Sequence, residues 1–274
     1  MKWSKSKIGF AIFVYILIYY SLFGSFLILF SKIINFKEQW YIIFLVLYFP
    51  LVAVITWTYH VCITSNPGFI PLITVEEIGE FEEYFEFCEK CNSSRPIGSH
   101  HCKTCKKCIL KMDHHCVWIT NCVGLCNQKY FIQFLVYLEL MCIFNLLIIL
   151  VNIVDLVDKD YHLDSYIFER NSLYFIFVNF LISVLFLLFV CIILINQIWA
   201  IVRGNSKIDE LKKIKFKKLT MKENLRVIFG NSFTQLLFPV KNKMFNYNED
   251  LKFETIIDMI RNKHLEITTK SEAI

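Results

Sequence analysis

This 274-residue sequence has little charge, and over long stretches it has none. Only 19% of its residues are Asp, Glu, Lys or Arg and 56% are hydrophobic, with a mean hydropathy of +0.49. Soluble domains usually carry about a quarter charged residues. The sequence also lacks internal repeats and low-complexity segments, which argues against an ankyrin-type or other repeat architecture. These shortages exclude an ordinary soluble domain and indicate a membrane protein.

Four long segments hold most of the apolar residues. Segments 8–31, 40–63 and 171–202 contain no charged residue, and segment 130–154 contains only Glu139. About 20 apolar residues are enough for a helix to cross a bilayer. The first segment is too long for a signal peptide, and no small-residue cleavage site follows it. We therefore predict an all-α membrane protein with four transmembrane helices.

The placement of Lys and Arg predicts the orientation of these helices. Of the 29 Lys and Arg residues, 25 lie in the N-terminal segment, between the second and third spans, and in the C-terminal tail. Since positive residues accumulate on the cytosolic side, we expect both termini and the central piece to be cytosolic. The predicted parts are 1–63 (helices 1–2), 64–129 (cytosolic linker and cysteine-rich domain), 130–202 (helices 3–4) and 203–274 (cytosolic tail). We expect a Golgi or endoplasmic reticulum membrane, with the plasma membrane as the alternative.

Cysteine is concentrated in the central piece. Seven of the eleven cysteines and four of the seven histidines fall in the stretch from Cys88 to Cys122, with repeated Cys-x2-Cys spacing. Such pairs are typical of tetrahedral zinc sites, and six cysteines with two histidines would complete two Cys3His sites. The count leaves one cysteine over without identifying it. Disulfides are the poorer interpretation in the cytosol, and interleaved histidines disfavour redox pairs or scattered thiols.

The run Asp113-His114-His115-Cys116 offers a second kind of chemistry. A free thiol beside a histidine can exist as a thiolate–imidazolium pair, which is nucleophilic near neutral pH. A nearby carboxylate orients the imidazole ring and favours its charged form. Asp113, His114 and Cys116 are therefore candidates for a nucleophilic site.

The stretch from Cys88 to Phe131 resembles the cysteine-rich domain of the DHHC-type zinc-finger protein S-acyltransferase (palmitoyltransferase) family. The matching pieces, in order, are FCEKC, SHHCKTCKKC, DHHCVWITNCVG and NQKYF. Four spans with this domain between the second and third also match the family.

This resemblance implies a role for each matching residue. One zinc ion would be bound by Cys88, Cys91, His101 and Cys108, and a second by Cys102, Cys105, His115 and Cys122. Cys116 would be the acyl acceptor, His114 the general base and Asp113 the residue that orients the base. The zinc ions would be structural, and His100 would have no role and lie at the surface.

The implied function is transfer of a palmitoyl-type acyl chain from acyl-CoA to protein cysteines, through a thioester on Cys116. The partners would be membrane-associated proteins with cytosolic cysteines and the lipid bilayer. The basic run from Lys212 to Lys218 could attract anionic lipid or the phosphates of CoA, and no recognition fold around it suggests nucleic acid. The alternatives are a membrane-anchored zinc scaffold, which would not need Cys116 or His114, a RING-like ubiquitin ligase, and a transporter.

Several positions depart from the family pattern. Asn66-Pro67-Gly68 replaces the usual Asp-Pro-Gly, and we expect a structural turn there. Ser206-Lys207-Ile208-Asp209 replaces Thr-Thr-x-Glu, and Gly98 replaces an arginine. Asn224 resembles the family's C-terminal asparagine. Cys126 has no ligand role, and we expect a buried thiol.

Glu139 is unusual because a carboxylate inside a span is costly unless it finds a partner or a cavity. It could line an acyl cavity, but we favour a polar contact between helices, with Asn179 or Asn196.

Overall fold

The computed structural model describes residues 5–33, 38–158, 166–204, 206–212, 220–240 and 252–261. Apart from Lys212, the predicted basic run lies outside the described residues. The chain forms two compact units, one of residues 1–57 and 134–195 and the other of residues 58–133 and 196–274. The predicted four-part division follows chain order and stays a prediction.

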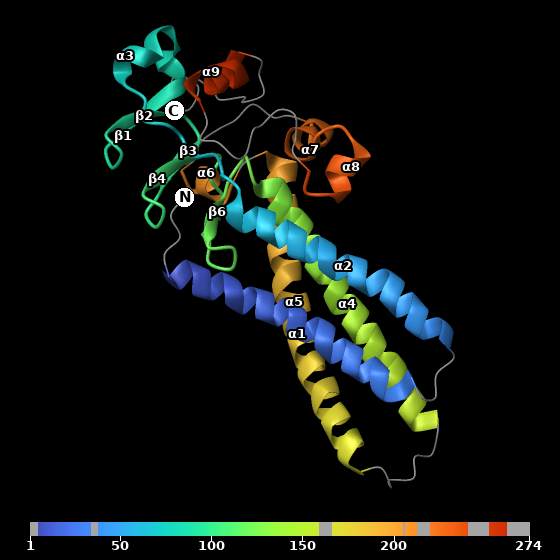
Figure 1. The fold of residues 1–274 in the computed structure, drawn as a ribbon. Coiled ribbons are helices and arrows are strands. Elements are labelled where there is room, and N and C mark those ends of the chain that lie inside the picture. Colours follow the sequence, from blue (N-terminus) through green and yellow to red (C-terminus); the bar gives the residue numbers. More distant parts are fainter. Residues whose placement is uncertain are drawn as a thin grey trace. The chain divides into compact units, whose positions relative to one another are not determined.

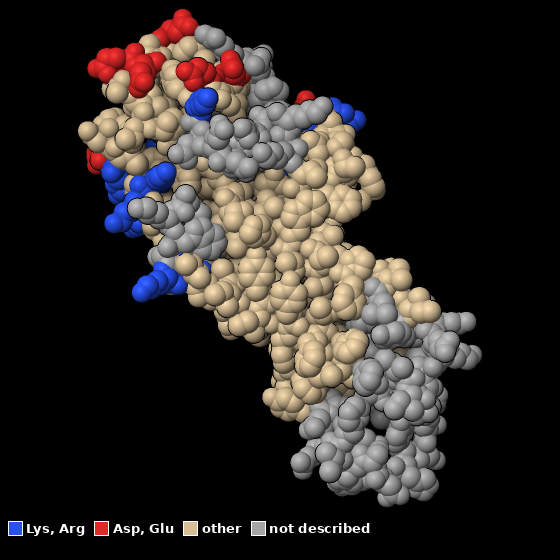
Figure 2. Space-filling model, in the orientation of Figure 1, with Lys and Arg blue, Asp and Glu red and all other residues tan. Residues whose placement is uncertain are grey.

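Four long helices dominate the fold: α1 (Lys5–Ile33), α2 (Glu38–Thr64), α4 (Gln128–Asp158) and α5 (Tyr166–Arg203) (Figure 1). Each contains an apolar stretch long enough to cross a membrane. Large apolar side chains are exposed along them, for example Leu185 (66%) and Ile192 (62%) on α5. The uncharged helix surface in Figure 2 is what a lipid-facing helix requires. The predicted all-α fold with four spans is confirmed.

A buried asparagine joins three of these helices in the first unit. Asn145 on α4 is 1% exposed. Its Oδ1 accepts hydrogen bonds from Ser25 of α1 (2.7 Å) and Tyr48 of α2 (2.6 Å), and its Nδ2 donates to Ser21 of α1 (2.6 Å). Between helices in a membrane, where apolar side chains gain little by leaving lipid, such hydrogen bonds specify the packing.

The expected contact between Glu139 and Asn179 is wrong. In the described part of the chain, Glu139 Oε2 is buried without a hydrogen-bond partner. Asn179 instead donates to the carbonyl of Phe175, one turn earlier in its own helix. Among the described residues, Oδ1 of Asn179 also has no hydrogen-bond partner, so the two side chains do not satisfy each other.

The second unit contains the cysteine-rich region between α2 and α4, as predicted. After the short helices α3 (Val75–Ile78) and η1 (Gly79–Tyr84), it forms three antiparallel hairpins. These pair β1 (Phe85–Cys88) with β2 (Ser93–Pro96), β3 (Ser99–Cys102) with β4 (Lys107–Leu110), and β5 (His114–Cys116) with β6 (Asn121–Val123). Figure 2 shows acidic side chains gathered over α3 and η1.

Buried apolar side chains form a cluster among these hairpins. One cluster consists of Phe69, Cys102, Ile109, Met112 and Cys122. Isolated two-stranded hairpins are at best marginally stable. The hairpins therefore need a further source of stability, such as bound metal.

Two turns explain departures from the family pattern. Asn66 Oδ1 accepts hydrogen bonds from the backbone N–H groups of Gly68 and Phe69, both at 2.8 Å. This Asx turn needs only a side-chain oxygen, which Asn supplies as well as Asp. Gly98 has φ of 82° between β2 and β3, a conformation that an arginine would adopt only with strain. The structural interpretation of the turn is confirmed.

The tail contributes α6 (Lys207–Leu211), α7 (Met221–Phe229), α8 (Phe233–Leu237) and α9 (Phe253–Arg261) to the second unit. Two buried side chains at the start of α4 hold the segment around α8. Lys129 Nζ donates to the carbonyl of Val240 (2.8 Å), and Gln133 Nε2 donates to that of Leu236 (2.7 Å). Gln133 thus satisfies a carbonyl in the last turn of a short helix, and Lys129 satisfies one just beyond it.

Candidate active site and metal centres

The first two hairpins bring four predicted ligands together. The ligand atoms of Cys88, Cys91, His101 and Cys108 lie within 4.8 Å of one another. His101 Nδ1 is 3.1 Å from Cys91 Sγ and 3.8 Å from Cys88 Sγ, and the sulfurs of Cys91 and Cys108 are 3.6 Å apart. The antiparallel register sets His101 directly opposite Cys108.

A second group joins the second and third hairpins. The ligand atoms of Cys102, Cys105, His115 and Cys122 also lie within 4.8 Å of one another. His115 Nδ1 is 3.3 Å from Cys122 Sγ and 3.5 Å from Cys105 Sγ, and these two sulfurs are 3.5 Å apart. His115 and Cys122 face each other across the third hairpin. Both groups coincide with the ligand sets that the resemblance implies.

These donor sets fit a tetrahedral metal ion. Ligands about 2.3 Å from a central ion in a tetrahedron lie about 3.8 Å from each other, close to the observed separations. The ionisation of the clustered thiols also indicates a metal ion. The hydrogen bond with Cys122 lowers the pKa of Cys105 to about 5. The same hydrogen bond is the main cause that raises the pKa of Cys122, and burial of Cys122 is the second cause. Crowded thiols cannot all ionise without a cation among them, so both groups could hold a metal ion.

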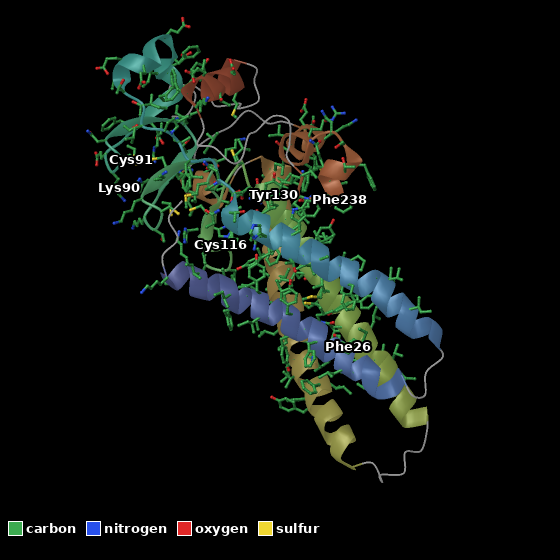
Figure 3. The ribbon with its side chains drawn as sticks, in the orientation of Figure 1. Phe26, Lys90, Cys91, Cys116, Tyr130 and Phe238 are labelled. Atoms are coloured by element: carbon green, nitrogen blue, oxygen red, sulfur yellow. The ribbon has the colours of Figure 1, made fainter. Side chains whose placement is uncertain are left out.

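The third hairpin separates a metal ligand from the candidate nucleophile. Side chains alternate between the two faces of a strand. In β5, His115 therefore faces the second cysteine group, while His114 and Cys116 share the opposite face. Figure 3 shows Cys116 on this hairpin, and its side chain is 5% exposed.

His114 is held between an acid and a thiol. Its Nδ1 lies 2.7 Å from Asp113 Oδ2, and the edge of its ring packs against Phe131, with ring centres 5.6 Å apart. Burial disfavours the charged ring, but hydrogen bonds with Asp113 and with Cys116 outweigh it and raise the pKa of His114 to about 9. This geometry suits a histidine that accepts and returns the proton of a thiol.

The end of α2 anchors this hairpin. Asn121, 1% exposed, donates from Nδ2 to the carbonyls of Cys62 (3.1 Å) and Ser65 (2.8 Å). Tyr59 donates from its hydroxyl to the carbonyl of Trp118 (3.1 Å). The turn that follows Cys116 is thus fastened to the last turns of a membrane-spanning helix.

Comparison with known proteins identifies the family. The family model for DHHC palmitoyltransferase matches residues 82–214. The chain is 30% identical over 224 residues to palmitoyltransferase ZDHHC3 of Rattus norvegicus and to that of Homo sapiens, covering 78% of this chain and 74% of each relative. It is also 30% identical over 221 residues to probable protein S-acyltransferase 14 of Arabidopsis thaliana, covering 71% of both chains.

The chain belongs to the DHHC palmitoyltransferase family. The predicted family and enzyme class, a protein S-acyltransferase, are confirmed. The family membership argues against the ubiquitin ligase and the transporter.

One sequence expectation about the DHHC region is wrong. His100 does not lie at the surface: it is 2% exposed, and its Nε2 lies 2.6 Å from Oδ1 of the equally buried Asp209. The partner stands 109 residues later, so local spacing could not reveal it. Asp209 and Ser206 also cap α6, with Ser206 Oγ donating to Asp209 Oδ2 (2.8 Å). The Ser-to-Asp run therefore retains a structural role.

Sequence reasoning also missed a polar contact to the DHHC aspartate. Gln197 near the end of α5 donates from Nε2 to Asp113 Oδ2 at 2.7 Å. A glutamine close to the end of a 32-residue uncharged run was the available signal.

Asn224 is buried and lines, with Asp113 and Gly204, a small cavity of about 40 Å³. Cys126 is 3% exposed, and burial raises its pKa to about 12, as fits the expected inert thiol.

Proposed function

We propose that this enzyme transfers a palmitoyl-type acyl chain from acyl-CoA to cysteines of substrate proteins, through a thioester on Cys116. The observation that carries the proposal is the position of His114 between Asp113 and Cys116. A scaffold that only binds partners has no need for an acid, a base and a buried thiol in this order. The palmitoyltransferase relatives support the same reaction.

The first step loads the enzyme. Because Nδ1 of His114 donates to Asp113, Nε2 is the nitrogen that holds the proton of the Cys116 thiol, and the raised pKa of His114 favours this thiolate–imidazolium pair. The thiolate attacks the thioester carbonyl of acyl-CoA, and the bond from that carbonyl to the CoA sulfur breaks. His114 returns its proton to the departing CoA thiolate, which leaves an acyl thioester on Cys116.

The second step delivers the acyl chain. The thiol of a substrate cysteine gives its proton to His114 and attacks the acyl-Cys116 thioester. The bond to Cys116 breaks, and the proton returns to the Cys116 sulfur. One group thus serves as base and acid in both halves of a ping-pong reaction.

We assign two structural zinc ions to the two cysteine-histidine groups. Each set offers three sulfurs and one imidazole nitrogen and leaves no position for water, which is typical of structural sites. When bound, the ions would supply folding free energy to the hairpins and fix the strand that carries Cys116.

The surroundings follow from the reaction. Acyl-CoA is an amphiphile, so we propose that its chain stays in the bilayer region while its thioester reaches Cys116. We further propose that both termini and this site are cytosolic, on the Lys and Arg distribution, in a Golgi or endoplasmic reticulum membrane. The substrates would be membrane-associated proteins with cytosolic cysteines.

Acyl loading tests this function directly. Purified protein would be incubated with labelled palmitoyl-CoA, and the hydroxylamine-sensitive label and zinc content would be measured for wild type and Cys116→Ser. We expect label on wild type only and equal zinc in both proteins. An unlabelled but zinc-loaded wild type would support the scaffold. Loss of zinc together with label would make Cys116 a metal ligand.

A further inference from the structure

The carboxylate of Asp113 receives two donors on one oxygen. His114 Nδ1 and Gln197 Nε2 both lie 2.7 Å from Asp113 Oδ2. Gln197 is 3% exposed and the Asp113 side chain is 10% exposed. A hydrogen bond to a buried charged acceptor is among the stronger interactions in a protein, so Gln197 has a large influence on where this carboxylate sits.

A second glutamine fixes which end of the Gln197 amide faces the acid. Gln128 at the start of α4 donates from Nε2 to Gln197 Oε1 at 3.2 Å. With its oxygen engaged by Gln128, Gln197 presents its NH2 group to Asp113. A flipped amide would set two oxygens against each other at Asp113 and two NH2 groups at Gln128. The side-chain amides of Gln128 on α4 and Gln197 on α5 thus direct one N–H donor to the Asp113 carboxylate.

We propose that Gln197 is a positioning residue for acyl transfer, held in place by Gln128. It fixes the Asp113 carboxylate so that the imidazole of His114 keeps the orientation in which Nε2 meets the Cys116 thiol. This inference rests on the proposed function and adds to it a residue outside the DHHC motif. The side chain of Gln197 donates to Asp113, and it acts through that carboxylate.

Replacing Gln197 with methionine tests the role of its amide. Methionine keeps the length of the side chain but donates no hydrogen bond. We expect the loading rate of Gln197→Met at saturating palmitoyl-CoA to fall about tenfold, the usual effect of losing a hydrogen bond to a charged group. The half-saturating concentration of palmitoyl-CoA and the zinc content should stay unchanged, because the proposed role of Gln197 is confined to the Asp113 carboxylate and Gln197 is in neither metal group.

Two further variants separate positioning from packing. Gln197→His retains a ring N–H donor at a similar reach and should recover most of the rate. Gln133→Met removes another buried glutamine of the same unit, one that donates to the carbonyls of Gln235, Leu236 and Phe238. It should load at the wild-type rate even if it lowers the unfolding temperature.

A double-mutant cycle with Asp113→Asn decides the mechanism. If Gln197 acts through Asp113, adding Gln197→Met to Asp113→Asn should cost little further rate. The inference is overturned if Gln197→Met loads like wild type, or if it costs the same factor with and without Asp113. If Gln197→Met loses zinc through misfolding, Gln197→His decides. If Gln197→His keeps its zinc but loads no faster than Gln197→Met, the inference is also overturned. Failure of wild type to load would instead reject the proposed function.

Discussion

His100 and Asp209 form a buried pair, 2.6 Å apart, between the second hairpin and the segment that follows α5. The carboxylate serves two structures. Its Oδ1 accepts from His100, and its Oδ2 accepts from the backbone N–H and the hydroxyl of Ser206 at the start of α6. One acidic side chain thus caps a helix and ties it to the cysteine-rich region.

This arrangement predicts a large loss of stability when one partner is removed. His100→Ala should destabilise the second unit by about 3–5 kcal/mol, because it leaves a buried carboxylate without its partner. Asp209→Ala should cost at least as much, since it also removes the α6 cap. The midpoint of thermal unfolding of zinc-loaded protein, followed in detergent, measures both effects.

A nearby exposed pair provides the control. Arg203 and Glu210 also form an ion pair, but both side chains are 45% exposed. Water screens such a pair, so Arg203→Gln should cost less than about 1 kcal/mol. Equal losses for His100→Ala and Arg203→Gln would contradict the structural role assigned to the buried pair.

Gly124 predicts a second stability effect. A Cβ atom on this residue would lie 2.4 Å from the carbonyl oxygen of Pro67 and 2.6 Å from a methyl carbon of Ile109. Since backbone cannot move aside easily, Gly124→Ala should destabilise the protein by about 1–3 kcal/mol. Gly9→Ala on α1, where nothing lies within 4 Å, is the control and should leave the unfolding midpoint unchanged or raise it, because alanine favours a helix interior. A Gly124→Ala variant as stable as Gly9→Ala would show that the 66–68 turn can shift.

Sequence reasoning succeeded where the signal is local. The four spans follow from runs of apolar residues, and the two cysteine-histidine groups from Cys-x2-Cys spacing together with the family motif. It failed for pairs formed by tertiary folding. The partner of Asp113 lies near the end of α5 and that of His100 lies after it, each more than 80 residues away. Neither hydropathy nor spacing records which distant helix will meet a hairpin.

The environment of His114 predicts a pH effect. Its pKa is raised to about 9, so the imidazolium is present at neutral pH and is lost as pH rises through that value. Because the hydrogen bond with Asp113 is the largest cause that raises the pKa, Asp113→Asn should move the transition well toward the ordinary value of about 6.5. Histidine NMR of zinc-loaded protein, with the signal assigned by its absence in His114→Gln, measures this shift. An unchanged transition in Asp113→Asn would rule out Asp113 as the partner of His114.

The two metal groups predict separate effects of removing their ligands. Cys91→Ser should reduce bound zinc from about two ions to about one, and Cys105→Ser should do the same at the other group. Cys105→Ser should reduce acyl loading more than Cys91→Ser does. The reason is that His115, a ligand of the same group as Cys105, lies in β5 between His114 and Cys116. Metal analysis and labelling of the same samples measure both effects, with Cys191→Ala on α5 as a control that keeps both ions. If Cys105→Ser kept full zinc and full loading, the second group would not be a metal site, and the hairpin would be held by the hydrogen bonds of Trp118 and Asn121 instead.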